Sequence, residues 1–266
     1  MANEIQVWNR VMAAAMAIPG VKVERKEYLS MTLMHYCEVD VLKDIIDGHR
    51  PSDFIDKSVL EQLAKSVINK HLREVTAISA AMGLPGGWFM AGTIPTDIAQ
   101  YYYHVFKLAQ KLAYIYGFPE FTDSEGNLTQ EAQNTLTLFV GAMMGVAIAN
   151  EGIQQIAQRL SGEVVKRLPQ KALTQTVIYP IVRQVAKWIG IKLTKESFAK
   201  GISKVIPVVS GAISGGLTYV SFKKGAKKLH KALYDAHIIM GEKATKKDKE
   251  PEFASYTEVN EENTYS

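Results

Sequence analysis

The sequence predicts an all-α fold, organised as a single multi-helix bundle domain, and three observations support this. Apolar residues recur at steps of three to four along most of the 266-residue chain, which is the spacing of one helix face, whereas strand-like alternation is almost absent. Hydrophobic residues make up 47% of the chain, enough to bury a large core. Two apolar stretches carry glycines one helical turn apart, which is typical of closely packed central helices.

The first half of the chain predicts three main helices. The N-terminal helix is amphipathic and stops at Pro19-Gly20. A second helix is predicted over Asp56–Met82, where glycines and a proline follow. A third is predicted to begin at Thr96, a residue type favoured at helix N-caps, and to continue through Ile115, with Gly117 as its left-handed stop. The residues expected along one side of the N-terminal helix are Ile5, Trp8, Met12 and Met16.

The second half predicts further helices over residues 154–168 and 174–191, the latter ended by Gly190, and a short helix opening near Thr194. A lysine-rich helix is expected to end at about Met240. After Gly241 the chain is polar and charged and lacks periodicity, so residues 241–266 are predicted to be a disordered acidic tail. The sequence therefore predicts eight to ten helices. It divides the chain into an N-terminal amphipathic helix and linker (1–29), a helical domain (30–240) and the tail (241–266).

Two glycine-spaced stretches are predicted to form the tight centre of the bundle. Glycine within a helix costs about 1 kcal/mol relative to alanine, so a pair of glycines one turn apart indicates that another backbone approaches that face. The stretches are expected to be helical over Leu136–Asn150 and Val205–Phe222. Their glycines are Gly141 and Gly145 in the first, and Gly211, Gly215 and Gly216 in the second.

Several sequence blocks resemble the EcsC family of bacterial proteins. The blocks are Ala80–Trp88, Ile94–Ile98, Leu112–Phe118 and Val205–Tyr219, the last followed by a basic helix. The resemblance spans roughly residues 30–235 and implies a helical bacterial protein, often discussed beside an ABC-transporter operon, without established chemistry. The acidic tail past Glu250 departs from the family pattern.

Composition favours a cytoplasmic protein. Cys37 is the only cysteine, so there is no disulfide framework and a reducing compartment fits best. The apolar run Val11–Ile18 is short for a secretory signal, although an uncleaved export signal is an alternative. Three longer stretches with little charge, 75–96, 132–150 and 205–222, are interrupted by prolines, glycines or polar residues. Burial inside the bundle is therefore favoured over membrane insertion as a hairpin or oligomer.

The lysine-rich helix predicts a surface for anionic membranes. Its lysines are Lys223, Lys224, Lys227, Lys228 and Lys231, beside an apolar stripe running from Phe222 to Met240. Such a helix can lie on an anionic leaflet, and a solvated outer face of a packed helix is the alternative. Nucleic acid is not an expected partner, because interleaved arginines and aromatics are missing.

Candidates for catalysis are few. Asp97, Tyr101 and His104 fall on one helix face at i, i+4 and i+7, where they could bind a polar ligand or exchange protons; ordinary structural roles for the three are favoured. His35 with Cys37, and His230 with His237, lack further ligands at a recognised spacing, so neither a metal nor a cofactor is expected.

The function predicted from the sequence is therefore interaction rather than catalysis. We expect a cytoplasmic protein that docks on the inner membrane leaflet or on a membrane-protein partner such as a transporter. Two alternatives stay open: a ligand-binding or enzymatic domain that uses Asp97, Tyr101 and His104, and a protein that inserts its glycine-spaced helices into the membrane. The sequence does not predict the oligomeric state.

Overall fold

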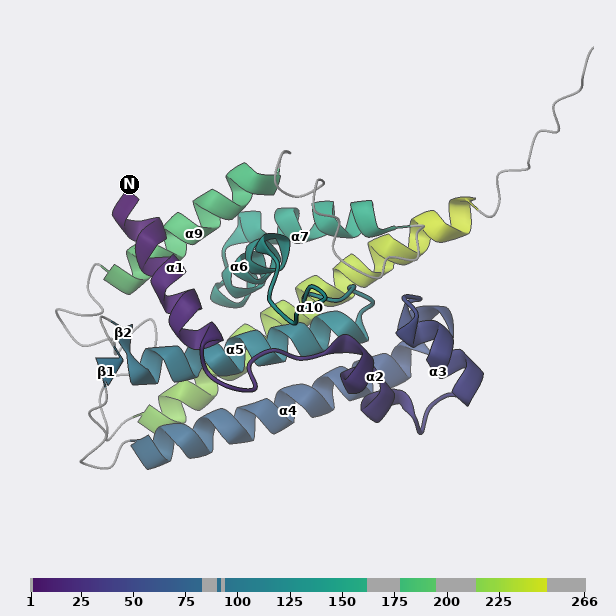
Figure 1. Cartoon of the computed structure of the whole chain (residues 1–266), viewed down its shortest axis with the longest axis horizontal. Coiled ribbons are helices and arrows are strands. Elements are labelled where there is room, and N and C mark those ends of the chain that lie inside the picture. Colours follow the sequence, from purple (N-terminus) through teal and green to yellow (C-terminus); the bar gives the residue numbers. More distant parts are fainter. Residues whose placement is uncertain (1, 83–89, 92–93, 162–177, 195–213, 248–266) are drawn as a thin grey trace, which may run out of the picture.

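The computed structural model describes residues 2–82, 90–91, 94–161, 178–194 and 214–247. The prediction of an all-α multi-helix domain is confirmed (Figure 1). Within the described residues the only paired strands are β1 (Met90–Ala91) and β2 (Ile94–Pro95), which form one short antiparallel ladder. The α-helices are α1 (Ala2–Met16), α2 (Arg25–Leu33), α3 (Val39–Ile46), α4 (Lys57–Met82), α5 (Thr96–Ile115), α6 (Gln130–Met144), α7 (Ala147–Leu160), α9 (Ile178–Thr194) and α10 (Ser214–Lys247).

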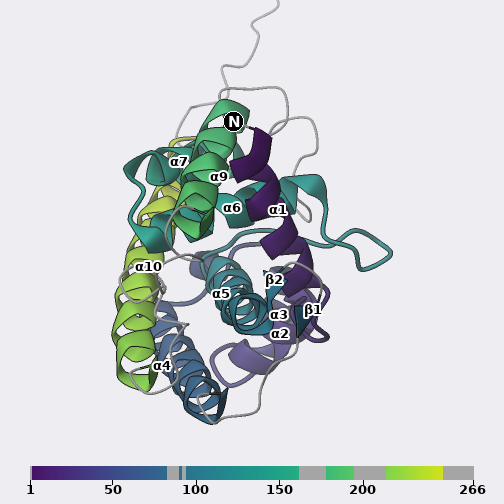
Figure 2. The ribbon, with the colours of Figure 1, turned by 90° about the vertical axis from the view of Figure 1, so that its left-hand side faces the viewer.

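Helix α5 lies in the middle of the bundle and packs against α1, α4 and α6. Helix α4 runs along it on one side, while the long helix α10 packs against α4, α6 and α7 (Figures 1 and 2). Most residues of α5 after Tyr103 are buried, because neighbouring helices cover it on several sides. Its side chains are therefore held in a dry environment, which matters for the polar groups among them.

The N-terminal helix belongs to this same core. Trp8 of α1 is 1% exposed, and its ring lies 5.3 Å from Tyr102 and 6.0 Å from Phe106, both of α5, between ring centroids. The indole N–H of Trp8 donates a hydrogen bond of 3.1 Å to the hydroxyl of Thr137 in α6. The predicted amphipathic helix is thus confirmed, and its apolar side closes the bundle rather than standing apart from it.

A buried arginine fixes the α2–α3 corner to the far end of α5. The Arg25 guanidinium donates hydrogen bonds to the carbonyls of Phe118 at 3.1 Å, Ile45 at 2.8 Å and His49 at 2.9 Å. Desolvation lowers the pKa of Arg25 from its ordinary value. The three carbonyls compensate for the water that the charged group loses on burial.

The first glycine-spaced stretch is not one helix, contrary to the prediction over Leu136–Asn150. Helix α6 ends at Met144, and Gly145 adopts the left-handed conformation with φ +83°. The amide N–H of Val146 then donates to the carbonyl of Gly141 at 2.9 Å, as in a glycine-terminated helix. Gly145 therefore ends a helix, and α7 begins two residues later.

Close approach of helices occurs at several other glycines, among them Gly141 and Gly190. A Cβ atom on Gly141 would lie 2.5 Å from Cγ1 of Val185 in α9, so α6 and α9 pack tightly there through a side chain. A Cβ on Gly190 would overlap the backbone of Glu4 in α1. The prediction that Gly190 ends its helix is wrong, since α9 continues through it to Thr194. The missing side chain of Gly190 instead makes room for the backbone of α1.

The boundaries of α4 and α5 follow the predictions closely, whereas α7 begins at Ala147 rather than at residue 154. Helix α4 ends at Met82, and α5 runs from Thr96 to Ile115, followed by Gly117 with φ +89°. Helix α10 ends at Lys247 rather than near Met240, so the first residues of the predicted tail are helical. Predictions for 162–177, 195–213 and 248–266 fall outside the described residues, as do Gly211 and the surroundings of Gly215 and Gly216.

Candidate functional site

Two groups of side chains on the bundle offer chemistry, and the first is the lysine face of α10. The apolar stripe of this helix faces the core: its residues Phe222, Ala226, Leu229, Leu233, Ala236 and Met240 are all completely buried. The opposite face carries Lys224, Lys227, Lys228 and Lys231, all exposed, with the half-buried Lys223 beside them. The apolar stripe is consequently used in folding and is not available to a lipid bilayer.

Three of these lysines also have neighbours within the protein. Lys223 donates to the hydroxyl of Tyr219 at 3.4 Å and lies over its ring. Lys231 forms an ion pair of 3.3 Å with Asp235. The ammonium group of Lys228 lies against Gly145, at the carboxyl end of α6, where the helix dipole favours a positive charge. These contacts are exposed and weak, so they leave the face strongly basic.

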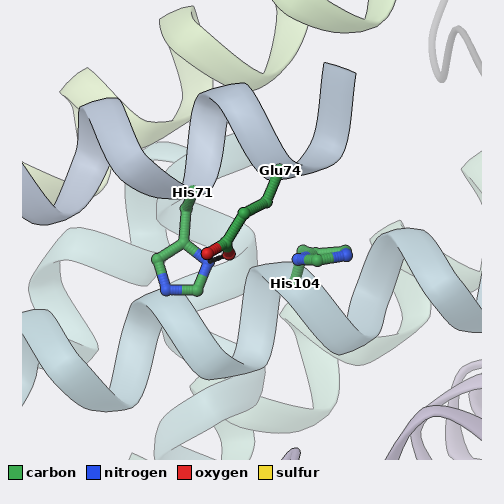
Figure 3. A group of neighbouring side chains, drawn as sticks. All are labelled: His71, Glu74 and His104. Atoms are coloured by element: carbon green, nitrogen blue, oxygen red, sulfur yellow. Dashed lines mark ion pairs between the residues drawn. The ribbon is translucent and has the colours of Figure 1, made fainter. Parts of the chain in front are cut away.

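The second group is His71, Glu74 and His104, which lie between α4 and α5 (Figure 3). The side chains of His71 and Glu74 leave α4 one turn apart, and His104 comes from α5. Their ligand atoms all lie within 4.8 Å of one another. Nδ1 of His71 is 3.4 Å from Oε2 of Glu74, and the centroids of the two imidazole rings are 6.2 Å apart.

Both imidazole rings of this group are buried and lack hydrogen-bond partners among the described residues. His71 is 0% and His104 is 5% exposed, and no donor or acceptor is correctly oriented toward any of their four ring nitrogens. The ion-pair distance between His71 and Glu74 does not satisfy hydrogen-bond angles. Buried polar atoms are normally paired, so two unpaired rings facing a carboxylate are an unusual arrangement.

Burial and surrounding lysines keep these histidines neutral. Desolvation, followed by the charges of Lys111, Lys107 and Lys70 and by coupling to the titration of His104, lowers the pKa of His71 to about 3. Desolvation also lowers the pKa of His104, although Glu74 opposes the shift. Lys111 is itself affected, since burial and the neighbouring lysines lower its pKa to about 8. At neutral pH both rings therefore carry free lone pairs.

The predicted trio of Asp97, Tyr101 and His104 is only partly within the described side chains. The ring of Tyr101 packs against Tyr102 at 5.4 Å and Phe222 at 6.1 Å, and burial raises its pKa to about 12. His104 instead faces His71, across a different helix pair. The side chain of Asp97 lies outside the described residues, so the trio as a unit stays a prediction.

The remaining histidine and cysteine candidates have ordinary packing partners. His230 and His237 both lie against the ring of Tyr116, each with centroids 5.7 Å apart, and the Tyr116 hydroxyl is 2.6 Å from Nε2 of His230. Cys37 donates a weak hydrogen bond to the carbonyl of Leu33 at 3.6 Å. Burial raises the pKa of the Cys37 thiol, which makes it less reactive.

Sequence reasoning missed His71 and Glu74, although a signal was present. His71 lies four residues after Val67 and four before Val75, on the apolar stripe of the predicted helix. A histidine in that position must be buried, and a glutamate one turn later lies beside it on the helix surface. Its partner His104 could not be found by spacing, because the contact joins two helices across the unpatterned 83–95 connection.

Comparisons with protein families, with curated proteins and with solved structures found no match. The resemblance to the EcsC family therefore stays a prediction. Among the described helices, none combines the length and apolar character required to cross a membrane. Chemically, the described residues offer a basic surface on α10 and a buried two-histidine, one-carboxylate group that has the ligand types of a transition-metal site.

Proposed function

We propose that this protein docks on the anionic inner leaflet of a membrane through the lysine face of α10. The observation that carries the proposal is the complete burial of the apolar stripe of that helix. The exposed face carries Lys224, Lys227, Lys228 and Lys231, with the exposed Tyr219 and Val220 near the start of the helix, so docking would be mainly electrostatic and peripheral.

The expected strength is sufficient for reversible binding. Each lysine near an anionic surface contributes about 1 kcal/mol, so the group of five would contribute about 5 kcal/mol at low ionic strength. The Debye length falls from about 10 Å at 0.1 M salt to about 3 Å at 1 M, and binding should weaken accordingly. The net charge of +4 acts in the same direction at longer range.

A membrane-protein partner, such as a transporter, is the alternative that the EcsC resemblance suggests. Such a partner would bind the same lysines through acidic side chains of its own. The enzymatic alternative based on Asp97, Tyr101 and His104 gains no support from the different partners of Tyr101 and His104. The alternative of membrane insertion through the glycine-spaced stretches gains no support from the described parts of α6 and α10, because neither helix is long and apolar enough to cross a membrane.

Cosedimentation with vesicles tests the proposal. The wild-type chain should bind vesicles that contain phosphatidylserine, bind neutral vesicles weakly, and dissociate at 1 M salt. A triple variant, Lys224→Gln, Lys227→Gln and Lys231→Gln, should lose most of this binding. A charge-matched control, Lys22→Gln, Lys26→Gln and Lys43→Gln, removes three exposed lysines from another part of the bundle and should bind nearly as well as the wild type.

Two outcomes would contradict the proposal. Equal loss of binding in both triple variants would show that net charge, and not this face, is responsible. Absence of binding to anionic vesicles, together with capture by detergent-solubilised membrane protein that depends on the same three lysines, would assign the face to a protein partner instead.

A further inference from the structure

We propose that His71, Glu74 and His104 form a binding site for a divalent transition-metal ion, zinc foremost, held between α4 and α5. The inference is independent of membrane docking, because the three residues lie away from the exposed lysine face of α10 and on other helices.

The donor set selects the class of metal. Two imidazole nitrogens and one carboxylate oxygen suit zinc and its neighbours, whereas magnesium and calcium prefer sites made of oxygen alone. Among the described residues this is the one group of histidine, cysteine, aspartate and glutamate side chains whose geometry fits three ligands to a common ion. The chemistry of the group thus indicates a borderline metal rather than a hard one.

The unpaired rings are the independent observation that indicates a ligand. His71 and His104 are more than nine-tenths buried, and all four of their ring nitrogens lack hydrogen-bond partners among the described residues. Leaving such groups unpaired is costly, and a coordinated ion would satisfy one nitrogen on each ring. The ring of His104 also packs edge-on against Tyr103, with centroids 4.9 Å apart, but this contact pairs none of the four ring nitrogens.

The distances are close to those that coordination requires. Two ligand atoms on a tetrahedral zinc ion, each about 2.0 Å from it, are about 3.3 Å apart. Nδ1 of His71 and Oε2 of Glu74 are already 3.4 Å apart, and the three ligand atoms lie within 4.8 Å. Figure 3 shows the three side chains directed into the space between the two helices. Rotation of the partly exposed Glu74 side chain can narrow the remaining gap.

The surroundings allow access and set the charge. The side chain of Glu74 is 40% exposed, so an ion can enter from solvent beside it. Lys70, Lys107 and Lys111 act against a cation, and the Glu74 carboxylate partly offsets them. Three protein ligands leave a fourth position for water, which distinguishes open zinc sites from closed structural ones.

Metal binding can be measured on the untagged full-length chain. After removal of metal with a chelator, the protein is dialysed against zinc and analysed for bound metal, and its cobalt form is examined by visible absorption. We expect one equivalent of zinc and the intense absorption of tetrahedral cobalt. His104→Leu and Glu74→Gln should each weaken zinc binding by at least about tenfold, because even the loss of an outer-sphere partner costs that much.

His237→Leu is the matched control. His237 is 2% exposed, with both ring nitrogens unpaired among the described residues, but it lies on α10 in the cluster around Tyr116. Its replacement should leave zinc binding unchanged. If His104→Leu does not fold, Glu74→Gln decides the question, since it alters a partly exposed side chain and keeps its shape.

Three results would overturn the proposal. The first is that the wild-type chain binds no zinc at micromolar concentration. The second is that Glu74→Gln binds zinc as tightly as the wild type. The third is that His237→Leu loses zinc binding together with the ligand variants. The first excludes a metal site, and the other two place the metal on different residues.

Discussion

The bundle holds two pairs of histidines, one between α4 and α5 and the other on α10, and they differ in the third group beside each pair. His71 and His104 lie near the carboxylate of Glu74, while His230 and His237 both pack against the phenol ring of Tyr116. The phenol hydroxyl is hydrogen-bonded to His230, and the rings pack at tilted angles. A carboxylate instead provides a third metal ligand. The third group beside each pair, and not the number of histidines, therefore separates the candidate metal site from aromatic packing.

The largest expected effect concerns both pairs and appears on acidification. The folded-state pKa of His71 is about 3 and that of His237 about 4, well below the ordinary value near 6.5, because both rings are buried. As the pH falls below 6.5 the unfolded chain binds protons that the folded chain cannot, so stability decreases. Between pH 7 and pH 5 each ring should remove about 2 kcal/mol from the free energy of unfolding.

Urea unfolding at the two pH values measures this effect. His71→Leu and His237→Leu should each reduce the pH-dependent loss by about 2 kcal/mol, and the double variant by about twice as much, since the sites are distant. Equal pH dependence in all variants would show that neither ring is held neutral by burial.

Sequence patterns predicted much of the fold because helix periodicity is local. The spacing of apolar residues in α4, and the N-cap at Thr96 and stop at Gly117 for α5, predicted helix boundaries that the structure confirms. The patterns failed at Gly145 and Gly190, because spacing alone cannot distinguish a glycine that ends a helix from one that admits a neighbour. That distinction depends on which backbone packs against the glycine. At Gly190 this is the backbone of Glu4, which is far away in the sequence and cannot be found from local spacing.

The candidate site was less predictable than the fold for the same reason. The lysine face of α10 follows from periodicity within one helix, so its residues could be named in advance. The metal site joins His104 to two residues of another helix, and nothing in the spacing of α4 specifies its register against α5. Only the burial of His71 could be anticipated, from its place between Val67 and Val75.

The second prediction separates the two pairs through added zinc. At a free zinc concentration one hundred times the dissociation constant, binding should add about 2.7 kcal/mol to the stability of the wild-type chain, which raises the melting temperature by roughly 5–10 °C for a chain of this size. His71→Leu should abolish the increase and His237→Leu should retain it. Differential scanning calorimetry with and without zinc provides the measurement, and an unchanged wild-type midpoint would contradict the site.

The third prediction tests the aromatic pair. Tyr116→Phe removes the hydroxyl that lies 2.6 Å from Nε2 of His230 and should destabilise the protein by about 1 kcal/mol, without any effect on zinc binding. Tyr234→Phe is a suitable control, because its ring packs against Tyr116 and His237 in the same cluster without that hydrogen bond. Chemical denaturation measures both variants. A larger loss in the control would mean that the hydrogen bond is not what holds this pair.

The smallest expected effect comes from the charges around each pair, and two lysines of α4 form a matched test. The positive charge of Lys70 acts on His71, and the positive charge of Lys65 acts on His230. Both lysines are exposed. Removing a like charge near a bound cation should strengthen zinc binding, and a surface charge of this kind is worth about 0.5 kcal/mol. Lys70→Gln should therefore tighten zinc binding about twofold, and Lys65→Gln should not change it.

Isothermal titration at low salt measures the difference in zinc affinity between the two variants. The difference should disappear at 1 M salt, because the charges are then screened within about 3 Å. An equal gain in both variants would indicate a general effect of net charge and would remove this support for a cation beside His71.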